Sequence, residues 1–224
     1  RPLAEKYELC GLYCQPDKKK GRHGHLSCPP VKQYAADLGI PIFQPSSVRL
    51  SEVVAQISEI SPDLIVVAAY GKILPPEILQ IPQYGCLNVH ASLLPHYRGA
   101  APVHWSVFSG DTVTGNTIML MDEGMDTGAI LRQKKLDILP EESSVSLMNR
   151  LAEQGADLLL ETIPDWTAGK IVPVPQDNEN ASLAPILKKE TGQLNWEWNA
   201  AKILRHLRAF DPWLGSWTSF RNKL

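Results

Sequence analysis

The sequence predicts an α/β fold with a doubly wound, mostly parallel sheet. Candidate strands and helices alternate from about residue 6 to residue 169, the order typical of such sheets. The run DLIVVAA at residues 63–69 is almost continuously apolar, as in strands buried on both faces of a parallel sheet. After Gly169, prolines and polar residues replace this alternation, which indicates a linker.

The first ninety residues are expected to form short elements. Residues 30–38 predict a helix, because Pro30 stands in its first turn and Gly39 follows its end. Residues 49–60 predict a second helix from the spacing of their apolar residues. We expect strands at residues 6–14, 40–43, 63–69 and 85–90, a loop at 15–30, and one helical turn before residue 85.

Longer elements follow. We expect a helix at residues 98–110, strands at 114–121 and 129–138, and a last helix at 199–210. Ser143 or Ser144 should cap a long helix that ends near Gly169. The apolar face of this long helix is predicted to contain Leu147, Met148, Leu151, Leu158, Leu159, Ile163 and Trp166.

Composition excludes some classes of protein. The chain has 224 residues, is 44% apolar and carries a formal charge of −2, so it has no overall charge that attracts nucleic acid or membrane. No apolar run approaches the roughly 20 residues of a membrane span. The four cysteines form no CxxC pair, which favours reduced thiols and a cytoplasmic protein.

The N-terminus lacks both an initiator Met and the pattern of a secretion signal. A doubly wound fold normally opens with a strand, a turn and a helix. This chain is expected to begin at the end of that helix, with the first strand missing.

The segment NVHASLLP at residues 88–95 is the most informative in the chain. Alternation along a strand places Asn88 and His90 on the same face. The residues after them would form one wall of a site beyond the carboxyl end of the strand, where open α/β sheets bind ligands.

A Gly-rich acidic loop, MDEGMDTG at residues 121–128, contains Asp126. An Asp near a His can orient the imidazole and favour its charged form. Together, Asn88, His90 and Asp126 suit the attack of an amine on a carbonyl, because Asn88 can donate to the developing oxyanion and His90 can move a proton. Ser92 is not in a G-x-S-x-G turn, so a hydrolase elbow is unsupported.

These residue types alone give a weak signal, since an Asn-x-His pair is usually structural and an Asp in a Gly-rich loop is usually a turn residue. The longer segments LNVHASLLPHYRGAAPVHW and MDEGMDTGAIL resemble the formyltransferase family that uses 10-formyltetrahydrofolate. The resemblance extends from about residue 10 to residue 217. It implies a Rossmann-like fold with Asn88, His90 and Asp126 as catalytic residues.

The same resemblance implies folate contacts at Ser92, Leu93, Leu94 and Pro95. It places further contacts with the pterin in the turn Lys72, Ile73 and Leu74 and in the loop Asp122, Glu123 and Gly124. 10-Formyltetrahydrofolate is expected as the formyl donor, without a metal.

Members of the family that act on tRNA carry a C-terminal β-barrel after a linker. The resemblance therefore implies a catalytic domain at residues 1–172, a linker at 173–198 and the start of a truncated C-terminal domain at 199–224.

A basic loop contains Lys18, Lys19, Lys20 and Arg22. A charge run alone is usually a solvated loop, but family members that act on tRNA have a basic insertion here that contacts the acceptor stem. We therefore expect these residues to contact tRNA phosphates. His23 and His25 lie in the same loop without a Cys or acidic partner at ligand spacing, so no metal site is expected.

The implied reaction is transfer of a formyl group to the methionine amine of initiator methionyl-tRNA, by a monomer that does not bind membranes. Two alternatives remain open. One is a related formyltransferase or hydrolase with a small-molecule acceptor, and the other is a catalytically silent module that binds folate or RNA.

Overall fold

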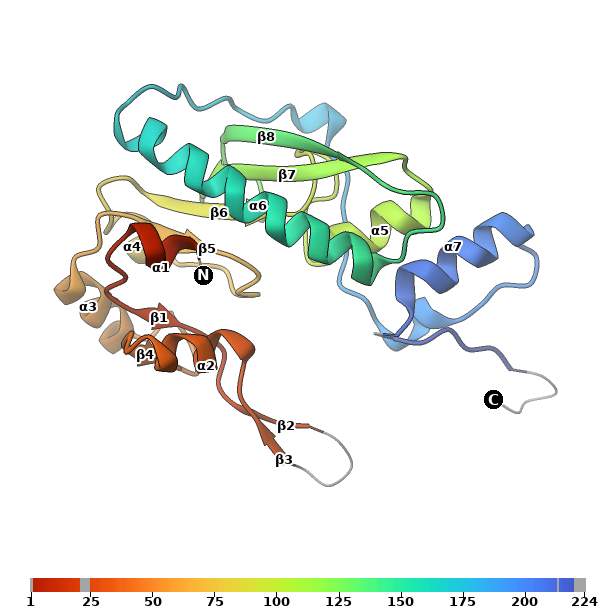
Figure 1. The fold of residues 1–224 in the computed structure, drawn as a ribbon, viewed down its shortest axis with the longest axis horizontal. Coiled ribbons are helices and arrows are strands. Elements are labelled where there is room, and N and C mark those ends of the chain that lie inside the picture. The colour runs from red at the N-terminus through yellow and green to blue at the C-terminus, as the bar shows by residue number, and fades with distance from the viewer. Residues whose placement is uncertain (1, 21–24, 213, 220–224) are drawn as a thin grey trace. The chain divides into compact units, whose positions relative to one another are not determined.

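The computed structural model describes residues 2–20, 25–212 and 214–219. The chain forms two compact units, Arg1–Cys86 and Leu87–Leu224, which are drawn together in Figure 1. Each unit is described separately below.

The first unit contains short helices and strands. In chain order they are α1 (Pro2–Lys6), β1 (Leu12–Tyr13), β2 (Lys18–Lys20), β3 (His25–Ser27), α2 (Pro30–Asp37), β4 (Ile42–Phe43), α3 (Ser51–Ile60), β5 (Ile65–Val67) and α4 (Pro76–Leu79). Strands β1 and β4 pair in parallel, and the rings of Tyr13 and Phe43 stack with centroids 4.7 Å apart. The predicted helices α2 and α3 and the single turn α4 are confirmed.

Two predictions for this unit are wrong. The strand expected at residues 6–14 is only Leu12–Tyr13, and Lys6 belongs to helix α1. The loop expected at residues 15–30 contains β2 and β3, which pair antiparallel with Lys18 opposite Ser27. Lysine is uncommon in strands, so the composition of this segment did not predict the pairing of β2 with β3, which depends on backbone hydrogen bonds.

The second unit contains the longer elements. They are β6 (Cys86–His90, which begins at the last residue of the first unit), α5 (Pro102–Ser109), β7 (Val113–Leu120), β8 (Ile130–Asp137), α6 (Ser144–Thr167), the 3₁₀ turns η1 (Asn178–Asn180) and η2 (Lys189–Gly192), and α7 (Ala200–Phe210). All the elements predicted for this half of the chain are present, with ends shifted by a few residues.

The predicted α/β class is confirmed, and the parallel pairing is seen between β1 and β4. Strands β6, β7 and β8 pair antiparallel, with His90 opposite Thr117 and Thr117 opposite Gln133. The pairing of β7 with β8 is antiparallel because only residues 121–129 connect them, too few for the crossover helix that a parallel pair needs.

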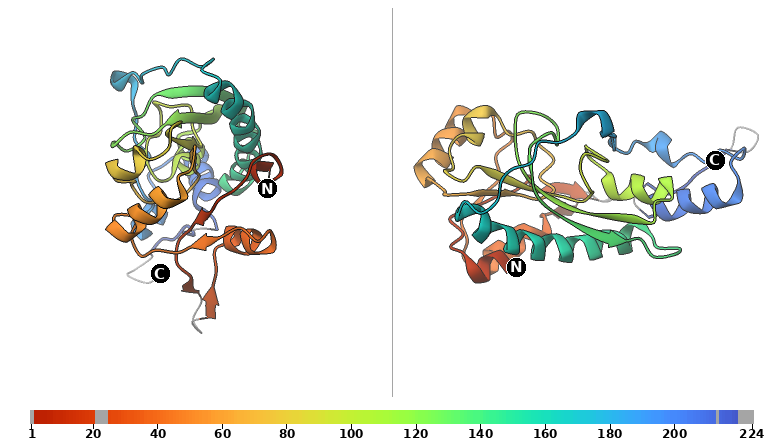
Figure 2. Two further views of the ribbon diagram at one scale, coloured as in Figure 1. Left: turned by 90° about the vertical axis from the view of Figure 1, so that its left-hand side faces the viewer. Right: turned by 90° about the horizontal axis from the view of Figure 1, so that it is seen from above.

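Helix α6 lies along β7 and β8 (Figures 1 and 2). Ser143 is its N-cap, and its hydroxyl accepts a hydrogen bond from the Ser146 N–H at 3.2 Å. At Gly155 the helix lies so near the sheet that a Cβ would be 2.9 Å from Val89. The predicted apolar face is buried except for Met148, which is 43% exposed, and Trp166, which is half-buried.

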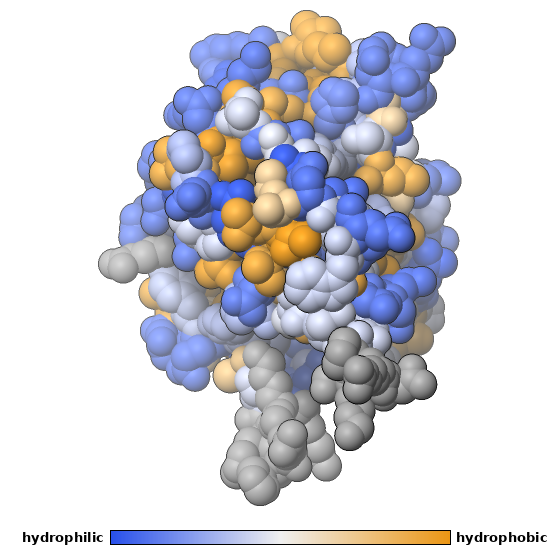
Figure 3. Space-filling view, turned by 90° about the vertical axis from the view of Figure 1, so that its right-hand side faces the viewer, coloured by the Kyte–Doolittle hydropathy of each residue, from blue (hydrophilic) through white to orange (hydrophobic). Residues whose placement is uncertain are grey.

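Helix α7 packs on α5, and together with α6 they enclose an apolar core. Its members are Val103, Val107, Leu147, Leu151, Ala209 and Phe210. Burial of each large side chain contributes about 1.5–3 kcal/mol. Outside this core, α7 exposes Leu204 and Leu207, and Figure 3 shows hydrophobic patches among hydrophilic residues on the side of the molecule that carries α7.

In the described residues no helix is long and apolar enough to cross a membrane. The domain boundaries expected near residues 172 and 198 stay a prediction.

Candidate active site

Strand β6 carries the first two residues of the predicted trio. Because side chains alternate along a strand, Asn88 and His90 lie on one face while Val89 points to α6. His90 is buried, with only 5% of its surface exposed, and Asn88 is half-buried. Both lie near the carboxyl end of β6, as the sequence predicts.

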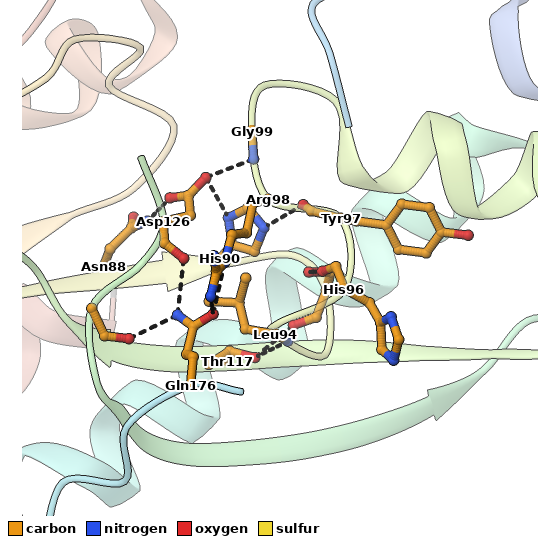
Figure 4. Close-up of polar contacts among 12 residues, drawn as sticks. Asn88, His90, Leu94, His96, Tyr97, Arg98, Gly99, Thr117, Asp126 and Gln176 are labelled. Carbon is orange, nitrogen blue, oxygen red and sulfur yellow. Dashed lines mark hydrogen bonds and ion pairs between the residues drawn. The ribbon is translucent and has the colours of Figure 1, made fainter. Parts of the chain in front are cut away.

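The third residue, Asp126, comes from the loop between β7 and β8 (Figure 4). One carboxylate oxygen, Oδ2, lies 3.7 Å from Nδ1 of His90 and accepts the backbone N–H of Gly99 at 2.8 Å. The other, Oδ1, accepts Nδ2 of Asn88 at 3.4 Å. The structure therefore brings Asn88, His90 and Asp126 together.

The second nitrogen of His90 has a different partner. Nε2 lies 2.9 Å from the backbone oxygen of Tyr97. Because a carbonyl oxygen only accepts hydrogen bonds, Nε2 carries a proton and donates it. Nδ1 is then the nitrogen that faces Asp126.

The segment Ser92, Leu93, Leu94 and Pro95 forms a rigid turn after β6. The Ser92 hydroxyl is fully buried and donates to His96 O at 2.6 Å, so it is occupied within the turn. Thr117 donates to Ser92 O at 2.6 Å and accepts the Leu94 N–H at 3.1 Å. The partly exposed side chains of this turn belong to Leu93 and Pro95, and its folate contact stays a prediction.

The loop of Asp122, Glu123 and Gly124 is exposed. Asp122 organises it, because its Oδ1 accepts the Gly124 N–H at 3.0 Å and the Thr127 hydroxyl at 2.7 Å. The Glu123 side chain is exposed to solvent. This ordering holds the loop that ends at Asp126.

The remaining predicted residues belong to the first unit. Ile73 is 52% exposed and Leu74 is buried at the end of the turn that starts with Lys72. Lys18, Lys19 and Lys20 form β2, and Lys18 is exposed. Arg22 lies outside the described residues. The roles of these residues in folate and tRNA binding stay predictions.

Sequence reasoning missed the side chains of Arg98 and Gln176. Gln176 donates to Asp126 O at 2.9 Å and accepts from Arg98 Nη2 at 2.7 Å (Figure 4). Gln176 lies in the stretch expected to be a linker, and a single glutamine there gives no recognisable signal. Arg98 lies in the segment LNVHASLLPHYRGAAPVHW, but nothing in that segment indicates that its partner is Gln176.

The same stretch also pairs with the turn that follows β6. Arg98 N–H donates to Ser182 O at 2.8 Å, and Ala184 N–H donates to Arg98 O at 2.7 Å. Residues 182–184 therefore hold the backbone beside the site. Within the residues that the structure describes, no group of three or more His, Cys, Asp or Glu side chains could hold a metal ion.

Chemically, the cluster offers an amide that donates to a carboxylate, with an imidazole nitrogen 3.7 Å from the same carboxylate. Such a set can stabilise a developing oxyanion and move a proton without a nucleophilic side chain.

Comparison with known proteins identifies the family. The formyl transferase family profile matches residues 4–163, and the profile of the formyl transferase C-terminal domain matches residues 186–224. A methionyl-tRNA formyltransferase of Synechococcus sp. (strain JA-3-3Ab) is 50% identical over 92% of this chain and 64% of its own length. One from Myxococcus xanthus (strain DK1622) is 44% identical over 99% of this chain and 72% of its own length.

Among solved structures, a sugar N-formyltransferase from a Shewanella species superposes with a TM-score of 0.71 at 26% identity, covering 85% of this chain and 76% of that one. The chain spans about two thirds to three quarters of the length of the two methionyl-tRNA formyltransferases. The family predicted from the sequence is confirmed: the chain belongs to the formyl transferases, among relatives named methionyl-tRNA formyltransferase.

Proposed function

We propose that this chain transfers the formyl group of 10-formyltetrahydrofolate to the α-amine of methionine on initiator methionyl-tRNA. The observation that carries the proposal is the convergence of Asn88, His90 and Asp126, from β6 and the β7–β8 loop, in a formyl transferase with relatives named for this reaction. The donor is the one that the family resemblance implies.

In the first step, the amine nitrogen attacks the formyl carbon and the carbonyl electrons move onto oxygen. Asn88 Nδ2 and a protonated His90 Nδ1 are the donors available to this oxyanion, since Nε2 of His90 is bonded to Tyr97 O. To reach the oxyanion, Asn88 Nδ2 would exchange its bond to Asp126 for one to the substrate, whereas Nδ1 of His90, 3.7 Å from Oδ2, has no such bond to exchange. A preorganised donor of this kind changes rates by about 10²–10³-fold.

In the second step, the attacking amine loses a proton and the bond from the formyl carbon to the folate N10 breaks. Asp126 lies beside Nδ1 of His90, so the carboxylate can take the proton from the amine while protonated His90 gives its Nδ1 proton to N10, and the proton on Asp126 can then return to Nδ1. The products are formylmethionyl-tRNA and tetrahydrofolate. No redox change occurs, and the proton count balances.

Binding would use the other predicted residues. Leu93 and Pro95 offer apolar surface to the folate, and the exposed Lys18 begins a basic strand suited to phosphate. Lys72 and Ile73 are proposed to contact the pterin, and the same contact is proposed for Glu123 and Gly124. We also propose that the protein is cytoplasmic, which the four free cysteines support, and that it is a monomer.

The direct experiment measures formyl transfer by the purified protein to charged initiator tRNA and, in parallel, to free methionine and amino sugars. Transfer to charged tRNA at least about 100-fold faster than to the small amines supports the proposal, because phosphate contacts then contribute to acceptor binding. Equal or faster transfer to a small amine would contradict the choice of acceptor.

A second candidate is a formyltransferase with a small-molecule acceptor, favoured by the similarity to the sugar N-formyltransferase structure. Substituting Lys18, Lys19, Lys20 and Arg22 together with Ala separates the two. The tRNA function predicts weaker binding to tRNA with a smaller salt dependence and unchanged folate binding. Unchanged tRNA binding by the variant would favour the small-molecule acceptor.

A further inference from the structure

The side-chain amide of Gln176 makes four hydrogen bonds beside the site (Figure 4). Its oxygen accepts Nε of Arg98 at 2.9 Å and Nη2 at 2.7 Å. Its nitrogen donates to the backbone oxygens of Asp126 at 2.9 Å and of Gly128 at 2.7 Å. Gln176 therefore links Arg98 to the backbone of Asp126 and of Gly128.

Only one orientation of this amide satisfies its neighbours. A guanidinium has only donors and a backbone carbonyl has only acceptors, so a flipped amide would meet donors with donors and acceptors with acceptors. Arg98 is itself fixed, because it is 93% buried and its Nη2 also donates to Oδ1 of Asn178 at 2.9 Å. The contacts of Arg98 thus set the direction in which Gln176 donates.

Asp126 needs an external restraint. Its φ of +54° lies in the left-handed region, which costs a residue with a Cβ about 1–2 kcal/mol. Its carboxylate accepts the Gly99 N–H, and Gly99 is the neighbour of Arg98. The contacts therefore form a closed loop. It leads from the Asp126 carboxylate to Gly99, along the chain to Arg98, from there to Gln176, and back to the Asp126 backbone. Neither the carboxylate nor the backbone of Asp126 can shift alone.

We propose that Gln176 is a positioning residue that holds the Asp126 carboxylate against His90, with Arg98 fixing the orientation of its amide. The inference rests on the proposed function for its kinetic test, but the geometry can also be measured without turnover. Gln176 would act through Asp126 and would not touch the reacting atoms.

Substitution of Gln176 with Ala tests the kinetic consequence. The variant should lower kcat about tenfold with both KM values within about twofold, because misplacing a catalytic group affects the transition state more than binding. Gln176→Glu keeps an oxygen for Arg98 but no donor for Asp126 O, so it should be equally slow.

A matched control is Gln154→Ala. Gln154 also donates to a backbone oxygen, that of Lys135 at 2.9 Å, and accepts from a side-chain amide, that of Asn116 at 3.1 Å, but it lies on α6. This variant should keep the kcat of the unsubstituted protein. If Gln176→Ala also keeps it, or changes only KM, the positioning role is wrong.

A double-variant cycle tests whether the effect passes through Asp126. In an Asp126→Asn background, Gln176→Ala should lower kcat by less than about twofold further, since the two residues act as a unit. A full additional tenfold loss would show that Gln176 acts independently of Asp126, which would overturn the proposal.

The ¹⁵N signals of the His90 ring give a readout without substrate. Gln176→Ala should move the Nδ1 signal toward its position in Asp126→Asn, whereas Gln154→Ala should leave it in place. An unmoved signal in Gln176→Ala overturns the positioning role. An unsubstituted protein that transfers no formyl group contradicts the proposed function instead.

Discussion

His90 is anchored to Tyr97 through Nε2, which donates to the Tyr97 backbone oxygen at 2.9 Å. This bond fixes the plane of the ring and leaves Nδ1 as the nitrogen beside Asp126, 3.7 Å from Oδ2. The proposed proton transfer therefore runs through Nδ1. A variant that changes Asp126, which faces Nδ1, should impair the reaction without disturbing the bond from Nε2 to Tyr97.

The first prediction concerns His90→Ala and Asp126→Asn. Each should lower kcat for formyl transfer by about 100-fold or more, because each removes a group that moves a proton or holds the one that does. The measurement is single-turnover transfer to charged tRNA. His96→Ala is the control, since that side chain is exposed, and near-normal turnover in either site variant would refute the assigned roles.

The second prediction compares two glycines. Gly99 has φ +119°, and a Cβ there would lie 2.8 Å from the backbone oxygen of Ala184, whereas Gly169 has φ +69° and open space around it. Gly169→Ala should lower the free energy of unfolding by about 1 kcal/mol through strain alone. Gly99→Ala adds a collision with backbone, so urea unfolding should show a larger loss, and equal losses would contradict the close approach.

The third prediction concerns Glu142, a buried carboxylate. Burial alone would raise its pKa, but hydrogen bonds from the Leu139 N–H, Arg150 and Ser146 outweigh burial and hold the pKa below its ordinary value of 4.5. The unfolded chain therefore binds the proton first. The stabilisation is complete above pH 4.5 and is lost as the pH falls through the folded pKa.

Glu142→Gln should accordingly lower the free energy of unfolding by about 1–3 kcal/mol at neutral pH, because the amide cannot accept all three donors. It should also reduce the loss of stability between neutral and acidic pH. Urea titrations of both proteins across that range measure this. An identical pH dependence in the two would contradict the role of Glu142.

The fourth prediction concerns His206 in α7, which is fully buried. Nε2 donates to Thr191 O at 2.9 Å and Nδ1 accepts the Ser216 hydroxyl at 3.0 Å, an arrangement for a neutral ring. Burial lowers the pKa of His206 below its ordinary value of 6.5, although the bond to Thr191 O opposes the shift. The stabilisation of the folded protein by neutral His206 is therefore present above pH 6.5 and is lost as the pH falls through the folded pKa.

His206→Gln can keep one donor and one acceptor but cannot titrate. Stability of the unsubstituted protein should fall between about pH 7.5 and pH 5.5, and the variant should show a smaller fall. Chemical denaturation at both pH values is the measurement. A fall of equal size in both proteins would show that other groups cause it.

Much of the fold could be predicted from the sequence because local signals and tertiary packing agree. Helix α6 begins after a Ser143 cap and buries its apolar face, and α2 starts at a proline and ends before a glycine. The pairing of β2 with β3 could not be predicted, because three consecutive lysines have low strand propensity and the backbone bonds that pair them leave no trace in residue type.

In the candidate site, too, some residues could be predicted from the sequence and others could not. Alternation along one strand placed Asn88 and His90 on the same face, but the resemblance to the formyltransferase family was needed to single out these two residues and Asp126. Gln176 could not be recognised, because its contacts depend on the pairing of Val174 with Ile130 in β8 and of residues 182–184 with the turn after β6. Such long-range pairing is not encoded in a short motif. Family resemblance located the proposed catalytic residues, but not Gln176, the residue proposed to position Asp126.

The closed circuit through Gln176 has a consequence for protein synthesis. Asp126 precedes Gln176 by 50 residues, and the residues that pair with Arg98 come later still. A nascent chain that ends between Asp126 and Gln176 contains all three proposed catalytic residues but lacks the contacts that fix Asp126. On the ribosome these contacts cannot form until residues 176–184 have emerged, so the site cannot reach its final geometry before then.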